Sequence, residues 1–223
     1  MITVHHLNHS RSQRVLWLLE ELGLTYELVR YERDPKTMLA PPELKAVHPL
    51  GKAPVVVDGD AVLAESGAII EHLAERYDRD HDLSAPAAGP QRDRERYWLH
   101  YAEGSLMPPL LLSLVVSRIR NARAPFFVRP IARRIADKVD AGFVQPQLST
   151  HLGFLEAELG RAEWFAGDRM TIADIQMSFP VQAARARLGL ERYPRLQAFL
   201  QRIEARPAYR RALERGGPFD LLS

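Results

Sequence analysis

The chain has 223 residues, of which 46% are hydrophobic and 26% charged, as is typical of soluble globular proteins with one large or two modest domains. Its formal net charge is only +2 and its basic residues are scattered, which argues against a nucleic-acid-binding protein. The absence of cysteine excludes disulfides, thiolate metal sites and a cysteine nucleophile.

The first 78 residues alternate strand and helix patterns. Residues 2–7 form a β-like run, apolar residues recur at helical spacing from Val15 to Leu22, and residues 26–31 predict a second strand. This order implies parallel strands joined by a crossover helix. Asp58-Gly59-Asp60 separates two short apolar runs and indicates a hairpin, which a helix over residues 65–77 follows. We therefore predict an α/β domain of order βαβ-ββα over residues 1–78.

Strand signals stop after residue 78. Residues 79–89 are rich in Asp, Ser, Pro, Ala and Gly, which predicts a linker. Beyond it we expect an all-α domain over residues 90–223, with helical patterns at 91–121, 125–160, 171–188, 194–205 and 207–214. Prolines predict a bend at 108–109 and interruptions near 130 and 146. Thr171 and Asp174 have the spacing of a capping box.

The most informative local pattern is a proline at the start of a strand, followed by a Glu-Ser pair. Pro54 precedes the apolar run that starts at Val55, and Glu65-Ser66 opens the next helix. Extended backbone can pair with a peptide main chain, and a helix N-terminus can bind a carboxylate. Because Glu65 can hold an ammonium, the pattern predicts a site for a zwitterionic peptide. The alternatives are a strand-edge proline without a ligand and an ordinary helix start.

This ordered set of features resembles the soluble glutathione S-transferase family, whose N-terminal domain is thioredoxin-like, over nearly the whole chain. The resemblance is greatest to the bacterial transferases that are similar to the fungal endoplasmic-reticulum-associated glutathione transferase. The matching phrases are His9-Ser10-Arg11-Ser12, Trp17-Leu18-Leu19, Pro41-Pro42-Glu43-Leu44, His48-Pro49-Leu50-Gly51, Lys52-Ala53-Pro54, Glu103-Gly104-Ser105-Leu106 and Met177-Ser178-Phe179-Pro180. His48 departs from the Asn that many members carry before this proline.

The resemblance implies that Ser10 is the catalytic residue, because active members carry a thiolate-stabilising group in this loop. The thiolate of glutathione is the nucleophile, and a hydrogen bond to the charged form lowers the thiol pKa. The N-terminus of the first helix adds positive potential. Ser12 competes for the role, although Arg14 matches a basic residue of serine-type members and favours Ser10. The alternative for either serine is a helix cap.

The resemblance also implies the residues that bind glutathione. The expected set is Lys52, Pro54, Val55, Glu65 and Ser66. A cis Ala53–Pro54 bond would present Val55 to the cysteinyl backbone, Glu65 and Ser66 would hold the γ-glutamyl end, and Lys52 would meet the glycyl carboxylate or remain solvated. Glu103 is a candidate for reaching the glutathione of a partner subunit. No metal is expected, since His5 and His6 alternate on a strand.

The resemblance implies a homodimeric glutathione transferase that acts in detoxification, and the absence of cysteine suits a reducing cytoplasm. Glutathione would be its co-substrate, and a small electrophile or a hydroperoxide its acceptor, whose identity the sequence does not predict. We expect no integral membrane segment, because the N-terminus lacks the pattern of a signal peptide and the longest apolar run, residues 110–116, is too short to span a bilayer. The alternative function is a non-catalytic carrier or stress regulator that binds glutathione or another ligand on the same scaffold.

Overall fold

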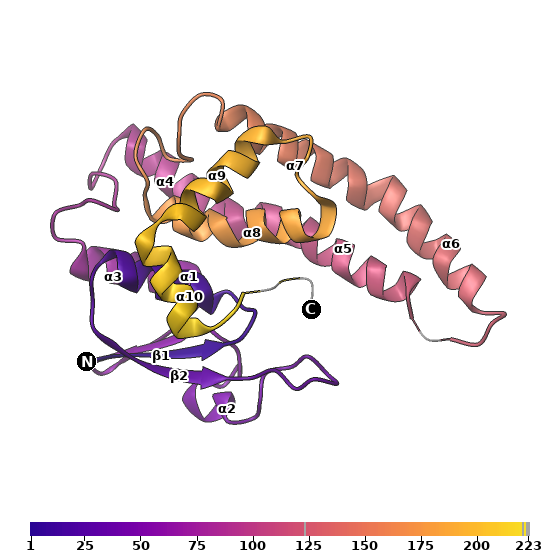
Figure 1. Ribbon diagram of the computed structural model, residues 1–223, viewed down its shortest axis with the longest axis horizontal. Coiled ribbons are helices and arrows are strands. Elements are labelled where there is room, and N and C mark those ends of the chain that lie inside the picture. Colours follow the sequence, from indigo (N-terminus) through magenta and orange to yellow (C-terminus); the bar gives the residue numbers. More distant parts are fainter. Residues whose placement is uncertain (123, 220, 222–223) are drawn as a thin grey trace.

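A four-stranded mixed sheet forms the N-terminal part of the protein. The computed structural model describes residues 1–122, 124–219 and 221, and Figure 1 shows the sheet beneath a larger helical part. The N-terminal elements are β1 (Ile2–Leu7), α1 (Ser12–Glu21), β2 (Tyr26–Tyr31), α2 (Leu44–Val47), β3 (Val55–Asp58), β4 (Ala61–Ala64) and α3 (Ser66–Tyr77).

The strand order is β2-β1-β3-β4, with β1 parallel to β2 and antiparallel to β3, and β3 antiparallel to β4. Gly59 supplies the positive φ of 61° that the β3–β4 hairpin needs. The predicted βαβ-ββα order, typical of thioredoxin-like domains, is therefore confirmed. Sequence reasoning missed the four-residue α2, which is too short to show a helical period.

In the described residues of the C-terminal part, the regular elements are all helices, as predicted. They are α4 (Pro90–Tyr101), η1 (Ala102–Leu106), α5 (Met107–Arg120), α6 (Arg129–Val139), η2 (Asp140–Val144), α7 (Gln145–Glu158), α8 (Ile172–Leu188), α9 (Pro194–Ala205) and α10 (Pro207–Gly216). α5 and α6 lie side by side and extend away from the sheet (Figure 1). Residues 123, 220, 222 and 223 of the predicted helical domain lie outside the described residues.

Two π-helical turns, η1 and η2, replace the bend and one interruption that the prolines predicted. Pro108 follows η1, and Pro146 follows η2. A proline within a helix cannot donate to the carbonyl four residues earlier, and its ring clashes with that carbonyl. The residues four positions earlier are Gly104 and Gly142, each inside its π turn. The wider turn accommodates the ring, so both long helices continue through their prolines.

α1 lies at the boundary between the sheet and the helical part, and it contacts α3, α8 and α10. Residues 15–19 of α1 are all fully buried. α8 is buried from Ile172 to Ala184 and forms the centre of the helical part. Since α1 is covered by both parts, side chains from its first turn reach α3 and α8.

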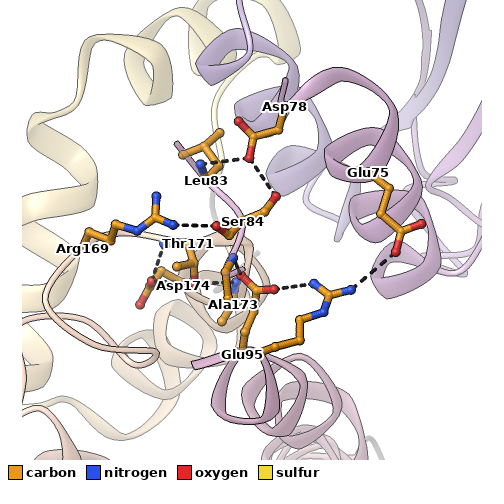
Figure 2. Close-up of polar contacts among 11 residues, drawn as sticks. Glu75, Asp78, Leu83, Ser84, Glu95, Arg169, Thr171, Ala173 and Asp174 are labelled. Atoms are coloured by element: carbon orange, nitrogen blue, oxygen red, sulfur yellow. Dashed lines mark hydrogen bonds and ion pairs between the residues drawn. The ribbon is translucent and has the colours of Figure 1, made fainter. Parts of the chain in front are cut away.

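The segment between α3 and α4 is anchored by buried carboxylates (Figure 2). Asp78 accepts hydrogen bonds from the Leu83 amide at 3.0 Å and the Ser84 hydroxyl at 2.7 Å. Arg169, just before α8, donates to the Ser84 carbonyl at 2.6 Å. Glu95 of α4 accepts from the amide of Ala85 at 2.9 Å. These bonds fix how α3 and α4 sit relative to each other, which in turn places the residues that they carry.

The predicted capping box at the start of α8 is present. The Thr171 hydroxyl accepts from the amide of Ala173 at 3.2 Å, and the Asp174 carboxylate accepts from the amide of Thr171 at 2.8 Å (Figure 2). Asp174 also accepts from the amide of Phe165 at 2.8 Å. The box therefore ties the preceding loop to the helix.

Length and composition alone would let the continuous helical stretch Pro90–Arg120 cross a membrane, since an 18-residue segment within it has a mean hydropathy of 1.2. Several of its apolar side chains are instead buried within the protein, as in core helices of globular domains. They are Trp98, Leu99, Ala102, Leu106 and Leu110.

Candidate functional site

Ser10 lies in the short connection between β1 and α1, in the wall of a cavity of about 580 Å³. Its side chain is largely buried, and Arg33, Lys45 and Lys52 line the same cavity. Ser12, the competing serine, is fully buried and does not line this cavity. The structure therefore gives the two serines different surroundings.

A chain of hydrogen bonds runs from Ser10 into the protein interior. The Ser10 hydroxyl lies 2.7 Å from the Ser12 hydroxyl, which lies 2.8 Å from Nδ1 of His6. Nε2 of His6 lies 3.0 Å from the carbonyl of Gly216 in α10. Burial lowers the pKa of His6 to about 4, so the ring is neutral at physiological pH.

Simple valence fixes the direction of these bonds. A carbonyl can only accept, so Nε2 of His6 carries the ring proton and Nδ1 accepts. The Ser12 hydroxyl has one hydrogen, which it donates to Nδ1 at 2.8 Å in preference to the more distant carbonyl of Leu7 at 3.2 Å, because Nδ1 would otherwise have no donor. Ser12 can then only accept from Ser10, whose oxygen also accepts from the Ser12 amide at 3.3 Å. The Ser10 hydrogen therefore points to Ser12 when the cavity holds no anion.

A second cavity, of about 320 Å³, brings together most of the predicted glutathione-binding residues. Lys52, Pro54, Glu65 and Ser66 line it, and the predicted cis bond between Ala53 and Pro54 is present. Val55 does not line this cavity; it is buried and pairs with β1 and β4. The backbone pairing of Val55 with a peptide stays a prediction.

Glu65 adopts a backbone conformation that sequence reasoning missed. Its φ is +67° at the junction of β4 and α3, a region that residues other than glycine rarely occupy. The conformation turns the chain sharply from the strand into the helix, so that Ser66 is the first residue of α3. Strain of this kind is found preferentially at ligand sites.

Behind Ser66 lies the guanidinium of Arg14, which is almost completely buried. It donates to the Ser66 hydroxyl at 2.6 Å and to the carbonyl of Gln176 in α8 at 2.6 Å. Burial lowers the pKa of Arg14 to about 10, although its ion pair with Glu103 opposes the shift. Because the Ser66 oxygen accepts from Arg14, the Ser66 hydrogen remains available to an anion in the cavity.

Glu103 joins the two parts of the protein. Its carboxylate, carried by η1, accepts from Nε of Arg11 at 2.9 and 3.0 Å and also pairs with Arg14. Burial alone would raise the pKa of Glu103, but the hydrogen bond from Arg11 and the charges of both arginines hold it below the usual range. Glu103 thus faces cations of its own chain, and its predicted contact with a partner subunit stays a prediction.

Arg11 is the site residue that sequence reasoning missed most clearly. It lines both cavities described above and carries positive charge next to Ser10. The signal was the spacing of Arg11 and Arg14, because residues three apart lie on the same side of a helix. Among the described residues no group of three potential metal ligands is found together.

Comparisons with known proteins agree with the two-part fold described above. The N-terminal domain of glutathione S-transferases matches residues 1–75, and the C-terminal domain matches residues 120–207. Glutathione S-transferase 1 of Saccharomyces cerevisiae is 37% identical over 96% of this chain and 95% of its own length. The chain belongs to the glutathione S-transferase family.

Further relatives of this transferase support the same assignment. Glutathione S-transferase 3 of Schizosaccharomyces pombe is 36% identical, over 96% of this chain and 88% of its own length. The crystal structure of a glutathione S-transferase from Actinobacillus pleuropneumoniae has a TM-score of 0.84 and 38% identity, covering 99% of this chain and 95% of the other. The resemblance stated from the sequence is therefore confirmed.

Proposed function

We propose that this transferase binds glutathione and that the Ser10 hydroxyl stabilises its thiolate for attack on an electrophile. The observation that carries the proposal is the position of Ser10. It lies at the start of α1, in the wall of a cavity that shares Lys52 and Arg11 with the cavity lined by Glu65 and Ser66. One peptide can therefore extend from the start of α3 to Ser10.

The charges of the site match those of glutathione. Ser66, with its oxygen held by Arg14, and the free amides at the start of α3 would bind the γ-glutamyl carboxylate. Glu65 would hold the ammonium, and Lys52 the glycyl carboxylate. Val55, next to the cis Ala53–Pro54 bond, would pair with the cysteinyl backbone.

Thiolate stabilisation requires only a rotation of the Ser10 hydroxyl. Its hydrogen would turn from Ser12 to the sulfur, and the Ser12 oxygen would retain a donor, the amide of Leu7 at 3.2 Å. Arg11 adds positive charge nearby. Both effects favour the thiolate over the thiol. The sulfur lone pair then forms a bond to the electrophilic carbon, and the leaving group departs with its bonding electrons.

Several finer expectations belong to the same proposal. The acceptor is a small electrophile or a hydroperoxide, so peroxidase activity would accompany conjugation. We also propose a cytoplasmic homodimer acting in detoxification without a metal. A glutathione transferase homologue from Lodderomyces elongisporus, 21% identical with a TM-score of 0.75, was solved with two glutathione molecules per subunit.

The hydrogen bond from Ser10 to Ser12 favours one second candidate, a non-catalytic glutathione carrier. If Ser10 keeps donating to Ser12 when glutathione binds, the thiol is not activated. The test is a pH titration of the thiolate absorbance of glutathione with protein in excess. A lowered thiol pKa supports the transferase, and binding with an ordinary thiol pKa supports the carrier. Absence of binding would contradict both.

A further inference from the structure

A third cavity adjoins the candidate glutathione site and is unusually rich in arginine. Its volume is about 320 Å³, and it lies between the residues that follow β1 and β2 and the facing sides of α5 and α8. Arg11 lines this cavity as well as the two glutathione cavities, so the third cavity borders the place proposed for the sulfur.

The described lining of this cavity combines apolar surface with four positive charges and no carboxylate. Met107, Leu114 and Phe179 are among its apolar residues, and Arg11, Arg33, Arg118 and Arg187 are its cations. An apolar wall suits any organic acceptor. The arginines indicate the charge of the acceptor.

Two of the four arginines form hydrogen bonds within the chain. Arg11 pairs with Glu103. Arg33 donates to the carbonyls of Asn8 at 3.2 Å and Met38 at 2.9 Å. Backbone carbonyls satisfy donors without neutralising the charge, so Arg33 keeps its positive field in the cavity.

Arg118 of α5 and Arg187 of α8 differ, because neither forms a hydrogen bond or an ion pair with another described residue. Nε of Arg187 is buried without a hydrogen-bond partner. Burial, and to a lesser degree the charge of Arg118, lower the pKa of Arg187. The buried Nε of half-buried Arg187 is costly to leave without an acceptor, and the positive charge of Arg118, which is exposed, adds a weaker repulsion. A bound anion would remove both penalties.

The geometry points to an acceptor that is an amphipathic organic anion, held by Arg118 and Arg187 through a carboxylate or phosphoryl oxygen. Guanidinium groups bind both kinds of oxyanion through paired hydrogen bonds. The apolar body of such an acceptor would lie along Met107 and Phe179, with its electrophilic carbon toward Ser10. This inference rests on the proposed function and names the substrate class of that site.

The test compares two electrophiles of the same shape. In a chloronitrobenzoate and the corresponding chloronitrobenzamide, the glutathione sulfur forms a bond to the ring carbon and chloride leaves with the bonding pair. Each kcat/KM is divided by the uncatalysed rate constant to correct for reactivity. We expect the wild type to prefer the anion by about tenfold, the effect of one or two charge-assisted hydrogen bonds.

Matched variants test whether Arg118 and Arg187 cause the preference for the anion. Arg187→Met and Arg118→Met should each lower the corrected rate for the benzoate about three- to tenfold and leave the benzamide within about twofold, while Arg187→Lys should restore part of the preference. Arg134→Met, which removes an exposed charge of α6, should leave the ratio unchanged. Equal losses for both electrophiles, or no preference in the wild type, would overturn the inference.

A binding measurement separates this inference from the proposed catalysis. Calorimetry of unreactive nitrobenzoate and nitrobenzamide, with S-methylglutathione bound, needs no turnover. Tighter binding of the benzoate that is lost in Arg187→Met supports the inference even if neither chloro compound reacts, a result that would contradict the transferase instead. Equal binding of the two probes would overturn the inference whatever the turnover. Nitrophenylphosphonate in the same assay distinguishes a phosphoryl from a carboxylate preference.

Discussion

The hydroxyl of Ser10 donates to the hydroxyl of Ser12 across 2.7 Å, because the hydrogen of Ser12 is committed to His6. One serine therefore lines the cavity with a hydrogen that can be redirected, and the other is held inside the protein. This difference is the reason why we propose Ser10, and not Ser12, as the group that stabilises a thiolate.

Replacing Ser10 with alanine should raise the thiol pKa of bound glutathione by about one to two pH units, which corresponds to the loss of one charge-assisted hydrogen bond. Turnover at neutral pH should fall by about tenfold or more, since less thiolate is present. Glutathione affinity should change little, because the charged ends bind elsewhere. Thiolate absorbance, initial rates and calorimetry measure the three effects. Unchanged turnover at neutral pH would show that Ser10 is not the activating group.

Replacing Ser12 with alanine should reduce the stability of the protein but leave the activation of the thiol intact. The change leaves Nδ1 of His6 and the amide of Leu7 without a partner, which should lower the free energy of unfolding by about 1–3 kcal/mol. Ser10 loses its acceptor and can donate to the thiolate at no cost, so the thiol pKa should stay low or fall further. Chemical denaturation and the thiolate titration test both points. A thiol pKa that rises in this variant, but not in Ser10→Ala, would reverse the roles of the two serines.

Two buried groups should make stability depend on pH in opposite directions. Burial lowers the pKa of His6 from 6.5 to about 4, so in that range the unfolded chain binds more protons and stability rises with pH. Burial also raises the pKa of Asp174 from 3.8 to about 7, so the folded chain binds more protons and stability falls with pH.

The two slopes, each about 1.4 kcal/mol per pH unit at full effect, should largely cancel in the wild type between pH 4 and 6.5. Asp174→Asn removes the falling contribution, so the stability of this variant should rise with pH relative to the wild type. His6→Gln removes the rising contribution, so the stability of that variant should fall with pH. Urea denaturation at several pH values measures them. Because a general loss of stability shifts each curve without tilting it, parallel curves for all three proteins would contradict the prediction.

Local pattern was sufficient for most of the fold. The strands Ile2–Leu7 and Tyr26–Tyr31 have the predicted bounds, because alternation and flanking turn residues mark both ends. The positive φ of Glu65 left no such signal, since glycine is the residue that usually indicates it. The π turns could have been found from glycine and proline four residues apart.

The candidate site was only partly predictable. Short motifs predicted Ser10, Lys52, Pro54, Glu65 and Ser66. All five line neighbouring cavities, and their roles in binding and catalysis stay predictions. The sequence did not predict the pairing of Arg11 and Arg14 with Glu103, because the partners lie about ninety residues apart. The packing of α1 against η1 determines which of these charges form ion pairs.

This ion pair across the two parts of the protein provides the last prediction. Glu103→Gln keeps the shape of the side chain but leaves the buried guanidinium of Arg14 without a counter-charge. We expect a loss of about 2 kcal/mol in the free energy of unfolding, below the 3–5 kcal/mol of a fully buried pair because Glu103 is partly exposed. The effect should be present above the ordinary glutamate pKa of 4.5 and disappear as pH falls through the lowered pKa of Glu103.

The matched control is Glu204→Gln, which breaks an ion pair with Arg185 on the surface. That change should cost less than about 0.5 kcal/mol, because exposed pairs are screened by water. Glu103→Gln should also weaken glutathione binding several-fold, since Arg14 holds the oxygen of Ser66, and calorimetry can measure this. If the two glutamine variants are equally stable and bind glutathione equally well, Glu103 is a surface charge, and the buried arginine is balanced by its other contacts.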